Sequence, residues 1–239
     1  MRRLAFALGL LTTVMLAAPA SPAHADCNDL RQSPTKVTHR APPQDLLSRM
    51  AVLRRPQQPD DLPGTNFGGG LFHLLAVDYI RKVGEGPDGQ SYYLIPGSAA
   101  YPRLSRACLR RLSPHRRRVE QRIEREQRRR ERIIGLGLFD FGRRGGGGGC
   151  CADAHALLAN HTVQTSGDDH HSTVAAFVPD GVASVTLRWH RGPERNATVS
   201  NNFWRTTVPL SAPRAFPHST IWRDADGHLV KSFRERGGR

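Results

Sequence analysis

The stretch that most constrains the fold of this chain runs from Val174 to Trp189 and reads VAAFVPDGVASVTLRW. Its two apolar runs flank a turn at Pro179-Asp180-Gly181. In the second run, Val185, Leu187 and Trp189 alternate with polar residues, which is the two-residue period of a strand with one buried face. A strand and a turn predict packed β structure but carry no chemistry, so this stretch leaves the function open.

The first 25 residues predict export. Arg2 and Arg3 precede an apolar run over residues 4–18, and Ala23-His24-Ala25 has the small-x-small pattern of a cleavage site. This arrangement is typical of a secretory signal peptide over residues 1–25, so we expect the protein to be secreted or held in the cell envelope. The alternative is an uncleaved membrane anchor, but the run is short for a span, and we expect no transmembrane span in the mature chain.

Composition points to small folded units and an anionic partner. The 239 residues are 38% hydrophobic with 23 glycines and 17 prolines, which leaves less core material than an average domain of this length has. The formal net charge is +14, mostly from arginine. Such a chain is attracted to nucleic acid, anionic lipid surfaces and phosphate-rich wall polymers alike, and charge alone does not choose among them.

The four cysteines are disulfide candidates, because all of them follow the predicted cleavage site and exported thiols usually oxidise. They are Cys27, Cys108, Cys150 and Cys151. Two bridges have three possible connectivities. Adjacent cysteines rarely pair with each other, so we expect Cys150 and Cys151 each to reach outward, to Cys108 or Cys27.

The chain after the signal peptide divides into four segments. We predict an extended lead-in over residues 26–44, a helix and β-hairpin region over 45–112, an Arg-rich helix and Gly-rich linker over 113–149, and a C-terminal β-rich region over 150–239. Leu46, Leu47, Met50, Val52 and Leu53 have near-helical spacing and predict one short amphipathic helix. The uninterrupted glycines 145–149 lack the Lys and Ser or Thr of a phosphate loop and predict a flexible tether. The fold class expected is α+β, with small antiparallel sheets built from hairpins.

The segment SPHRRRVEQRIEREQRRRERII, residues 113–134, predicts one exposed helix. Ser113 is a suitable N-cap with Pro114 at the first helical position, and Arg116–Glu120, Arg122–Glu126, Glu124–Arg128 and Glu126–Arg130 stand four residues apart. Its arginines are the candidate polyanion-binding residues, namely Arg116, Arg117, Arg118, Arg122, Arg125, Arg128, Arg129, Arg130 and Arg132. The alternative is a solvated helix that only separates two halves of the protein.

Several segments together resemble a family of secreted actinobacterial proteins without assigned function. They are LLSRMAVLRRPQQPDDLP, YYLIPG followed by Ala107-Cys108-Leu109, the glycine run before Cys150, VPDGVASVTLRW and TIWRDADGHLV. The resemblance implies export, a disulfide between Cys108 and one of Cys150 or Cys151, and a C-terminal β region. It transfers no catalytic residue, and the Arg-rich segment departs from its pattern.

The sequence gives no catalytic constellation, because its match to Ser-x-x-Lys, Ser33-Pro34-Thr35-Lys36, lies in a Pro-bounded extended segment and no Lys-Thr-Gly strand follows. Histidines and aspartates between residues 153 and 171 suggest an envelope hydrolase as an alternative, but their spacing matches no known ligand set, and we predict no metal, no cofactor and no catalytic residue. The Asp224-Ala225-Asp226-Gly227 run has its glycine too early for a calcium loop and predicts a hairpin turn. Trp189, Trp204 and Trp222 predict a core, whereas an exposed tryptophan patch would indicate a protein-binding β module. The function expected is therefore that of an exported, non-enzymatic protein that binds anionic polymer.

Overall fold

The computed structural model describes residues 30–31, 34–64, 71–86, 89–142, 145–160, 162–167, 171–190, 192–209 and 217–234. The predicted signal peptide, residues 1–25, and Cys27 lie outside the described residues, so these predictions stay predictions. The described chain folds into helices and small, mostly antiparallel sheets, which confirms the α+β class. Within the described ranges, no helix combines the length and apolar character that crossing a membrane would require.

The helices are short except for one. They are α1 (Gln44–Leu47), α2 (Ala51–Arg54), α3 (Arg106–Arg111), α4 (Pro114–Arg130) and α5 (Ala154–Leu158), with 3-10 turns η1 (Pro59–Asp61) and η2 (Val77–Tyr79). The strands are β1 (Leu30–Arg31), β2 (Lys36–Thr38), β3 (Phe72–Ala76), β4 (Arg81–Glu85), β5 (Ser91–Ala99), β6 (Arg103–Leu104), β7 (Gly135–Gly142), β8 (Gly145–Ala152), β9 (Gln164–Gly167), β10 (His171–Phe177), β11 (Ser184–Arg188), β12 (Arg195–Thr198), β13 (Phe203–Pro209), β14 (Ser219–Arg223) and β15 (Leu229–Arg234).

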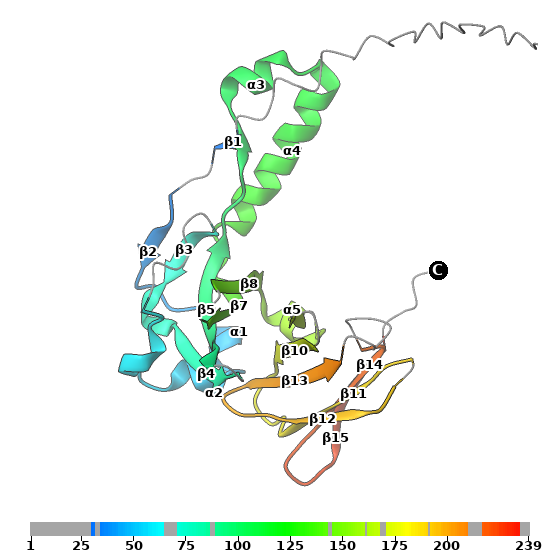
Figure 1. Cartoon of the computed structure of the whole chain (residues 1–239). Helices are drawn as coiled ribbons and strands as arrows, with labels where there is room; N and C mark the ends of the chain where they lie inside the picture. The colour runs from blue at the N-terminus through cyan, green and yellow to red at the C-terminus, as the bar shows by residue number, and fades with distance from the viewer. Residues whose placement is uncertain are drawn as a thin grey trace, which may run out of the picture.

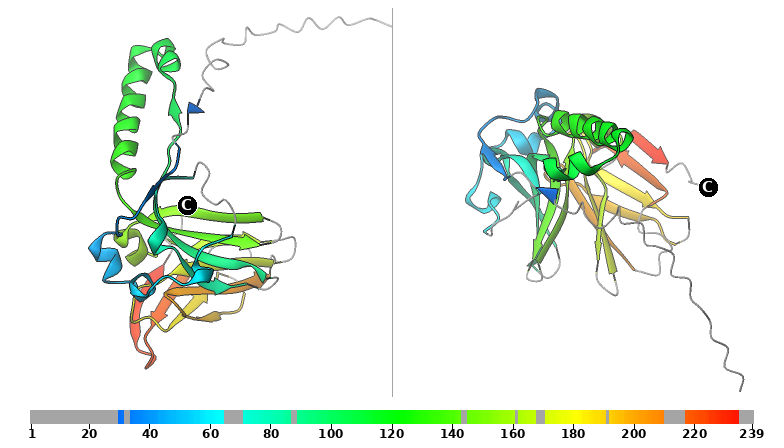
Figure 2. Two further views of the ribbon diagram at one scale, coloured as in Figure 1. Left: turned by 90° about the vertical axis from the view of Figure 1, so that its left-hand side faces the viewer. Right: turned by 90° about the horizontal axis from the view of Figure 1, so that it is seen from above.

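Three sheets form the body of the protein, and Figure 2 shows them as successive layers. Sheet I has the order β2-β3-β5-β7-β8, with β4 also on β5; sheet II has the order β13-β10-β9; and sheet III has the order β12-β11-β14-β15. All pairs within them are antiparallel except β2 with β3. One apolar cluster joins sheets I and II, and a second joins sheets II and III. Sheet II is therefore the central layer.

The position of strand β10 between two apolar clusters accounts for the first apolar run of residues 174–189. Val174 and Ala176 belong to the cluster shared with sheet III, whereas Ala175 and Phe177 belong to the cluster shared with sheet I. A strand covered on both faces needs apolar residues at every position, in contrast to the one-faced alternation of β11. The two runs do not pair with each other, because β10 lies in sheet II and β11 in sheet III.

The predicted amphipathic helix is wrong as a single element. It is broken at Met50, whose backbone is extended (φ −130°, ψ 92°), into α1 and α2. The N–H groups that open α2 find acceptors far away in the chain, because Ala51 donates to Asp180 Oδ1 (2.7 Å) and Val52 donates to Asn202 Oδ1 (3.0 Å). Four of the five apolar residues expected to pack, Leu46, Met50, Val52 and Leu53, are nevertheless buried, and Leu47 is partly buried against them.

Asp180 and Asn202 form a clasp between the N-terminal helices and the central sheet. Asn202, in the left-handed backbone region (φ 58°), donates from Nδ2 to Val178 O (3.1 Å) and to Asp180 Oδ1 (2.9 Å), and Arg54 pairs with Asp180 Oδ2 (2.8 Å). Burial by itself would raise the Asp180 pKa, but the hydrogen bonds from Asn202 and Ala51 and those from Arg54 outweigh it and lower the pKa. The predicted turn therefore also holds two parts of the fold together.

The glycine run is also different from the prediction. Glycines 145–149 are part of strand β8, which pairs with β7, so the expected flexible tether is a strand at the edge of sheet I. A Cβ placed on Gly148 would lie 2.3 Å from Cδ1 of Phe139 and 2.5 Å from the carbonyl oxygen of Leu138. The Phe139 ring occupies the space that a side chain would need, which is why glycine is required here.

We expect Gly148→Ala to lower the free energy of unfolding by about 1 to 3 kcal/mol, because the added methyl group overpacks the contact with Phe139. Chemical denaturation measures this. The control is Gly64→Ala, where a Cβ would meet nothing within 4 Å. If both variants unfold at the same denaturant concentration, the glycine run acts as a tether after all.

The C-terminal predictions agree with the structure. Strands β14 and β15 form a hairpin whose turn contains Gly227 with φ 83°. Asp224 Oδ1 accepts hydrogen bonds from the N–H groups of Asp226 and His228 and closes this turn. Trp189, Trp204 and Trp222 are all buried in the cluster between sheets II and III, so the tryptophan patch that would support a protein-binding module is not formed.

Candidate polyanion-binding arm

An arm made of residues 101–132 projects from the body and carries the predicted Arg-rich helix (Figure 1). It contains β6, α3 and α4 and is inserted between β5 and β7, which are neighbouring antiparallel strands of sheet I with Gly97 opposite Gly135. The arm has thirteen arginines, four glutamates and no lysine or aspartate, a formal charge of +9. Most of the excess charge of the chain is therefore concentrated in one projecting element.

Helix α4 begins and continues for the reasons predicted from the sequence. Ser113 is the N-cap and accepts a hydrogen bond from the Arg116 N–H, and Pro114 occupies the first turn. Of the four expected ion pairs, Arg128–Glu124 (2.6 Å) and Arg130–Glu126 (3.2 Å) are formed. Arg116 and Arg122 are not in an ion pair with any described residue. Every residue of α4 is described, and none is buried.

The base of the arm is fixed by a buried carboxylate. Glu131, which follows α4, is 3% exposed; its side chain pairs with Arg103, and its backbone oxygen accepts from Ser98 Oγ (2.6 Å). Strand β1 pairs with β6, so the N-terminal part of the described chain also runs along the arm. These contacts set the direction in which α4 leaves sheet I.

The far end of the arm is held by Arg117. Its guanidinium donates to the carbonyl oxygens of Leu109 (2.9 Å), Arg110 (2.8 Å) and Leu112 (3.3 Å), which follow or end helix α3. These carbonyls would otherwise lack partners at the helix terminus. Arg117 therefore joins α3 to α4, a structural role that the sequence prediction did not separate from binding.

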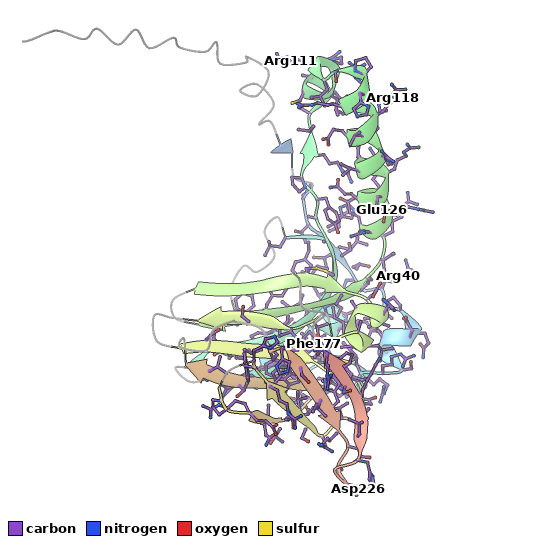
Figure 3. All side chains as sticks on the ribbon, turned by 90° about the vertical axis from the view of Figure 1, so that its right-hand side faces the viewer. Arg40, Arg111, Arg118, Glu126, Phe177 and Asp226 are labelled. Carbon is purple, nitrogen blue, oxygen red and sulfur yellow. A yellow bond between two sulfur atoms is a disulfide. The ribbon has the colours of Figure 1, made fainter. Side chains whose placement is uncertain are left out.

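The remaining candidate arginines fall into two groups. Arg128 and Arg130 are paired with glutamates, and these hydrogen bonds raise the pKa of both guanidiniums. The others extend into solvent, namely Arg116, Arg118, Arg122, Arg125, Arg129 and Arg132. In Figure 3 the labelled Arg118 points away from the arm, and Arg111 lies at its far end.

Four of the exposed arginines lie on a single face of α4. Arg118, Arg122, Arg125 and Arg129 follow the spacing i, i+4, i+7 and i+11, which keeps side chains on one side of a helix. We call this set the arginine stripe. The partly covered residues Arg117, Glu120, Glu124 and Gln127 lie on the other side. Among the residues that the structure describes, no stripe arginine has a carboxylate partner.

The cysteine pairing differs from the expectation. The structure has a disulfide-like contact between Cys150 and Cys151, whereas the family resemblance implied that Cys108 pairs with one of them. Cys108 is itself disulfide-bonded and is buried in α3. Cys27, the fourth candidate, lies outside the described residues.

The described histidines and aspartates give no support for a hydrolytic site. Asp153 caps α5 by accepting from the Ala156 N–H (2.8 Å), and His155 is exposed. His161, Asp168, Asp169 and His170 lie outside the described residues. A cavity of about 310 Å³ lies nearby, between β7, β8 and α5, and is lined by Leu136, Leu138, Gly149, Cys150, Cys151, Ala152, Ala156, Thr162 and Phe177. Among the described residues that line it, none has a carboxylate or an imidazole.

Asp224, Asp226 and His228 are the one group of three potential metal ligands found within the described ranges. The backbone hydrogen bonds to Asp224 explain this arrangement as turn geometry, as the sequence predicted. The group gives no support for a metal site.

Comparison with known proteins adds no identification. The chain matches no known family, no curated protein and no solved structure. The arm is therefore interpreted from its own residues.

Proposed function

We propose that this protein is an exported, non-enzymatic protein of the cell envelope or extracellular space and that its arm binds anionic polymer. The observation that carries the proposal is the concentration of a +9 charge in an element that projects from the body. The signal-peptide pattern of residues 1–25 supports export. Since polyanions are bound largely through their charges, a projecting cationic helix is suited to contact them.

The arrangement also separates binding from the fold of the body. Strands β5 and β7 pair directly, and no residue of α4 is part of an apolar cluster. The arm can therefore vary in charge without disturbing the layers of sheets I, II and III. Such independence favours a contact element over a spacer, because a spacer would connect two folded units, whereas here both ends of the arm return to sheet I.

Deletion of the arm tests the proposal. In the variant, residues 101–132 are replaced by a short Gly-Ser turn, and Cys27→Ser is included so that loss of Cys108 does not leave an odd cysteine. We expect the affinity for a polyanion such as heparin or an oligonucleotide to fall by at least on the order of 100-fold at low salt, because about nine charges are removed. Fluorescence anisotropy measures the affinity.

The matched control is the Cys27→Ser, Cys108→Ser protein, which keeps the arm. It should bind as the unmodified protein does. If the arm deletion retains its tertiary structure by near-UV circular dichroism and still binds as tightly as this control, the proposal is overturned.

A further inference from the structure

We infer that the ligand of the arm is a linear phosphodiester polymer, and that the arginine stripe contacts its phosphates in succession along α4. This inference rests on the proposed function and names the ligand chemistry and the residues that recognise it. Its basis is that the arginines of the arm differ in the contacts they make in the folded protein, although the sequence alone does not distinguish them.

The stripe is the set of exposed arginines without a described carboxylate partner that lie together on one face of α4. Arg117 is used on the carbonyls of α3, Arg103 on Glu131, and Arg128 and Arg130 on neighbouring glutamates. Arg118, Arg122 and Arg129 have no described ion pair, and Arg125 has only a long contact to the Gln121 carbonyl (3.3 Å). Arg118, Arg122 and Arg129 can therefore bind an external anion without giving up an ion pair within the described residues, and Arg125 would give up only the contact to Gln121.

The spacing of the stripe suits a polymer that runs along the helix. At a rise of 1.5 Å per residue, the interval from Arg118 to Arg129 spans about 16 Å. A strand of duplex nucleic acid places one phosphate about every 3.4 Å along its axis, so this length covers about five phosphates. Four arginines can therefore neutralise about four consecutive phosphates of one polymer.

The basic side chains of the arm fit individual phosphate groups better than a diffuse negative surface. All basic residues of the arm that carry a fixed charge are arginine, whose planar guanidinium forms two parallel hydrogen bonds with a phosphate. A membrane surface would favour an apolar face opposite the charges. Helix α4 offers only Val119 and Ile123, so an anionic membrane is not the ligand that fits.

The contact is restricted to the polymer backbone. Helix α4 contains no phenylalanine, tyrosine or tryptophan, so it has no aromatic ring on which a base could stack. Recognition then depends on the phosphates, which nucleic acids share with polyol-phosphate polymers of cell walls. We therefore expect a base-free poly(glycerol phosphate) and a single-stranded oligothymidylate of equal charge to bind with similar affinity.

The test compares two variants of the full chain with the same charge. In the stripe variant, Arg118, Arg122, Arg125 and Arg129 are changed to glutamine. The control variant changes four arginines outside the stripe to glutamine: Arg128 and Arg130, which are paired with glutamates, and Arg110 and Arg111, which are exposed in α3 at the far end of the arm. Glutamine forms helix well, and far-UV circular dichroism checks that α4 is kept. Binding of oligothymidylate is measured over a series of salt concentrations, together with binding of poly(glycerol phosphate), poly-glutamate and phosphatidylglycerol vesicles.

For the stripe variant we expect the slope of log affinity against log salt to decrease in magnitude by about 3, the value for four phosphate contacts on a single strand. In the control variant, the magnitude of this slope should decrease by less than about 1. Changing the stripe to lysine should weaken binding on the order of tenfold, because charge is kept and the paired hydrogen bonds are lost.

Equal losses in the stripe and control variants would overturn the inference and leave the proposed function intact. Binding of poly-glutamate or of the vesicles as tight as that of the phosphate polymers would also overturn it. A large preference for oligothymidylate over poly(glycerol phosphate) would contradict recognition through phosphates alone. Failure of the arm deletion to change binding would instead remove the proposed function itself.

Discussion

Replacing Asp61 with asparagine is expected to lower the free energy of unfolding by about 3 to 5 kcal/mol. Asp61 is fully buried, and each of its carboxylate oxygens accepts two hydrogen bonds: Oδ2 from Arg55 Nη1 and the Gln58 N–H, and Oδ1 from Arg55 Nη2 and the Lys82 N–H, all at 2.7 Å. An amide has only one oxygen. Two of these donors would face an NH2 group, and the Arg55 charge would lose its partner. Urea denaturation at neutral pH measures the change.

The neighbouring Asp60→Asn variant is the matched control, because Asp60 is exposed and the same change in charge is made one residue away. It should change the free energy of unfolding by less than about 0.5 kcal/mol. A loss below about 1 kcal/mol for Asp61→Asn would show that the buried pair contributes little.

The same residue predicts a dependence of stability on pH. Burial by itself would raise the Asp61 pKa, but the hydrogen bonds from Arg55, Gln58 and Lys82 and the charge of Arg55 outweigh it and lower the pKa below its ordinary value of 3.8. A lowered pKa in the folded state means that the stability from Asp61 is complete above pH 3.8 and is lost as the pH falls through the folded-state pKa. Asp61→Asn should therefore lose less stability than the unmodified protein between neutral pH and about pH 3.

Replacing Trp204 with alanine should also lower the free energy of unfolding by about 3 to 5 kcal/mol. Trp204 is 1% exposed, and its ring lies in the cluster that joins sheets II and III. The substitution would leave a large cavity between two sheets, and no single neighbouring side chain can fill this cavity. Thermal and chemical denaturation, monitored by the fluorescence of the remaining tryptophans, measures the change in the free energy of unfolding.

Two further substitutions separate loss of packing from loss of the indole N–H. Trp204 Nε1 is buried and has no hydrogen-bond partner within the described part of the chain, so Trp204→Phe removes no observed hydrogen bond and should cost much less stability than Trp204→Ala. Leu229→Ala removes an apolar side chain that is 61% exposed and should have little effect. Equal effects for Trp204→Ala and Leu229→Ala would place Trp204 outside the core.

The arm shows which part of a site can be predicted from sequence. The cap at Ser113, the presence of one exposed helix and two of the four expected ion pairs follow from contacts within four residues, and these were predicted. The roles of individual arginines were not, because the partners of Arg117 and Arg103 are supplied by α3 and Glu131. The sequence marks the arginines as candidates, and the fold decides which are free.

Buried polar residues were the features that the sequence analysis missed. Asp61 lies in a segment, residues 56–70, whose composition is that of a loop, and Asn202 lies in a turn. Their partners are up to 150 residues away in the chain, as for Asn202 with Val52. A hydrogen bond of this kind leaves no local pattern, since any exposed turn can contain aspartate or asparagine.

Local regularity therefore determined the strands of the C-terminal region, the Arg-rich helix and the burial of the tryptophans, because these depend on periodic apolar and polar positions along one segment. Only the tertiary structure decided that the glycine run is a strand under Phe139 and that Met50 separates two helices. Each of these depends on which segment lies alongside another. The physical reason is that a residue's neighbours in space are set by the packing of the three sheets, whereas the sequence displays only its neighbours along the chain.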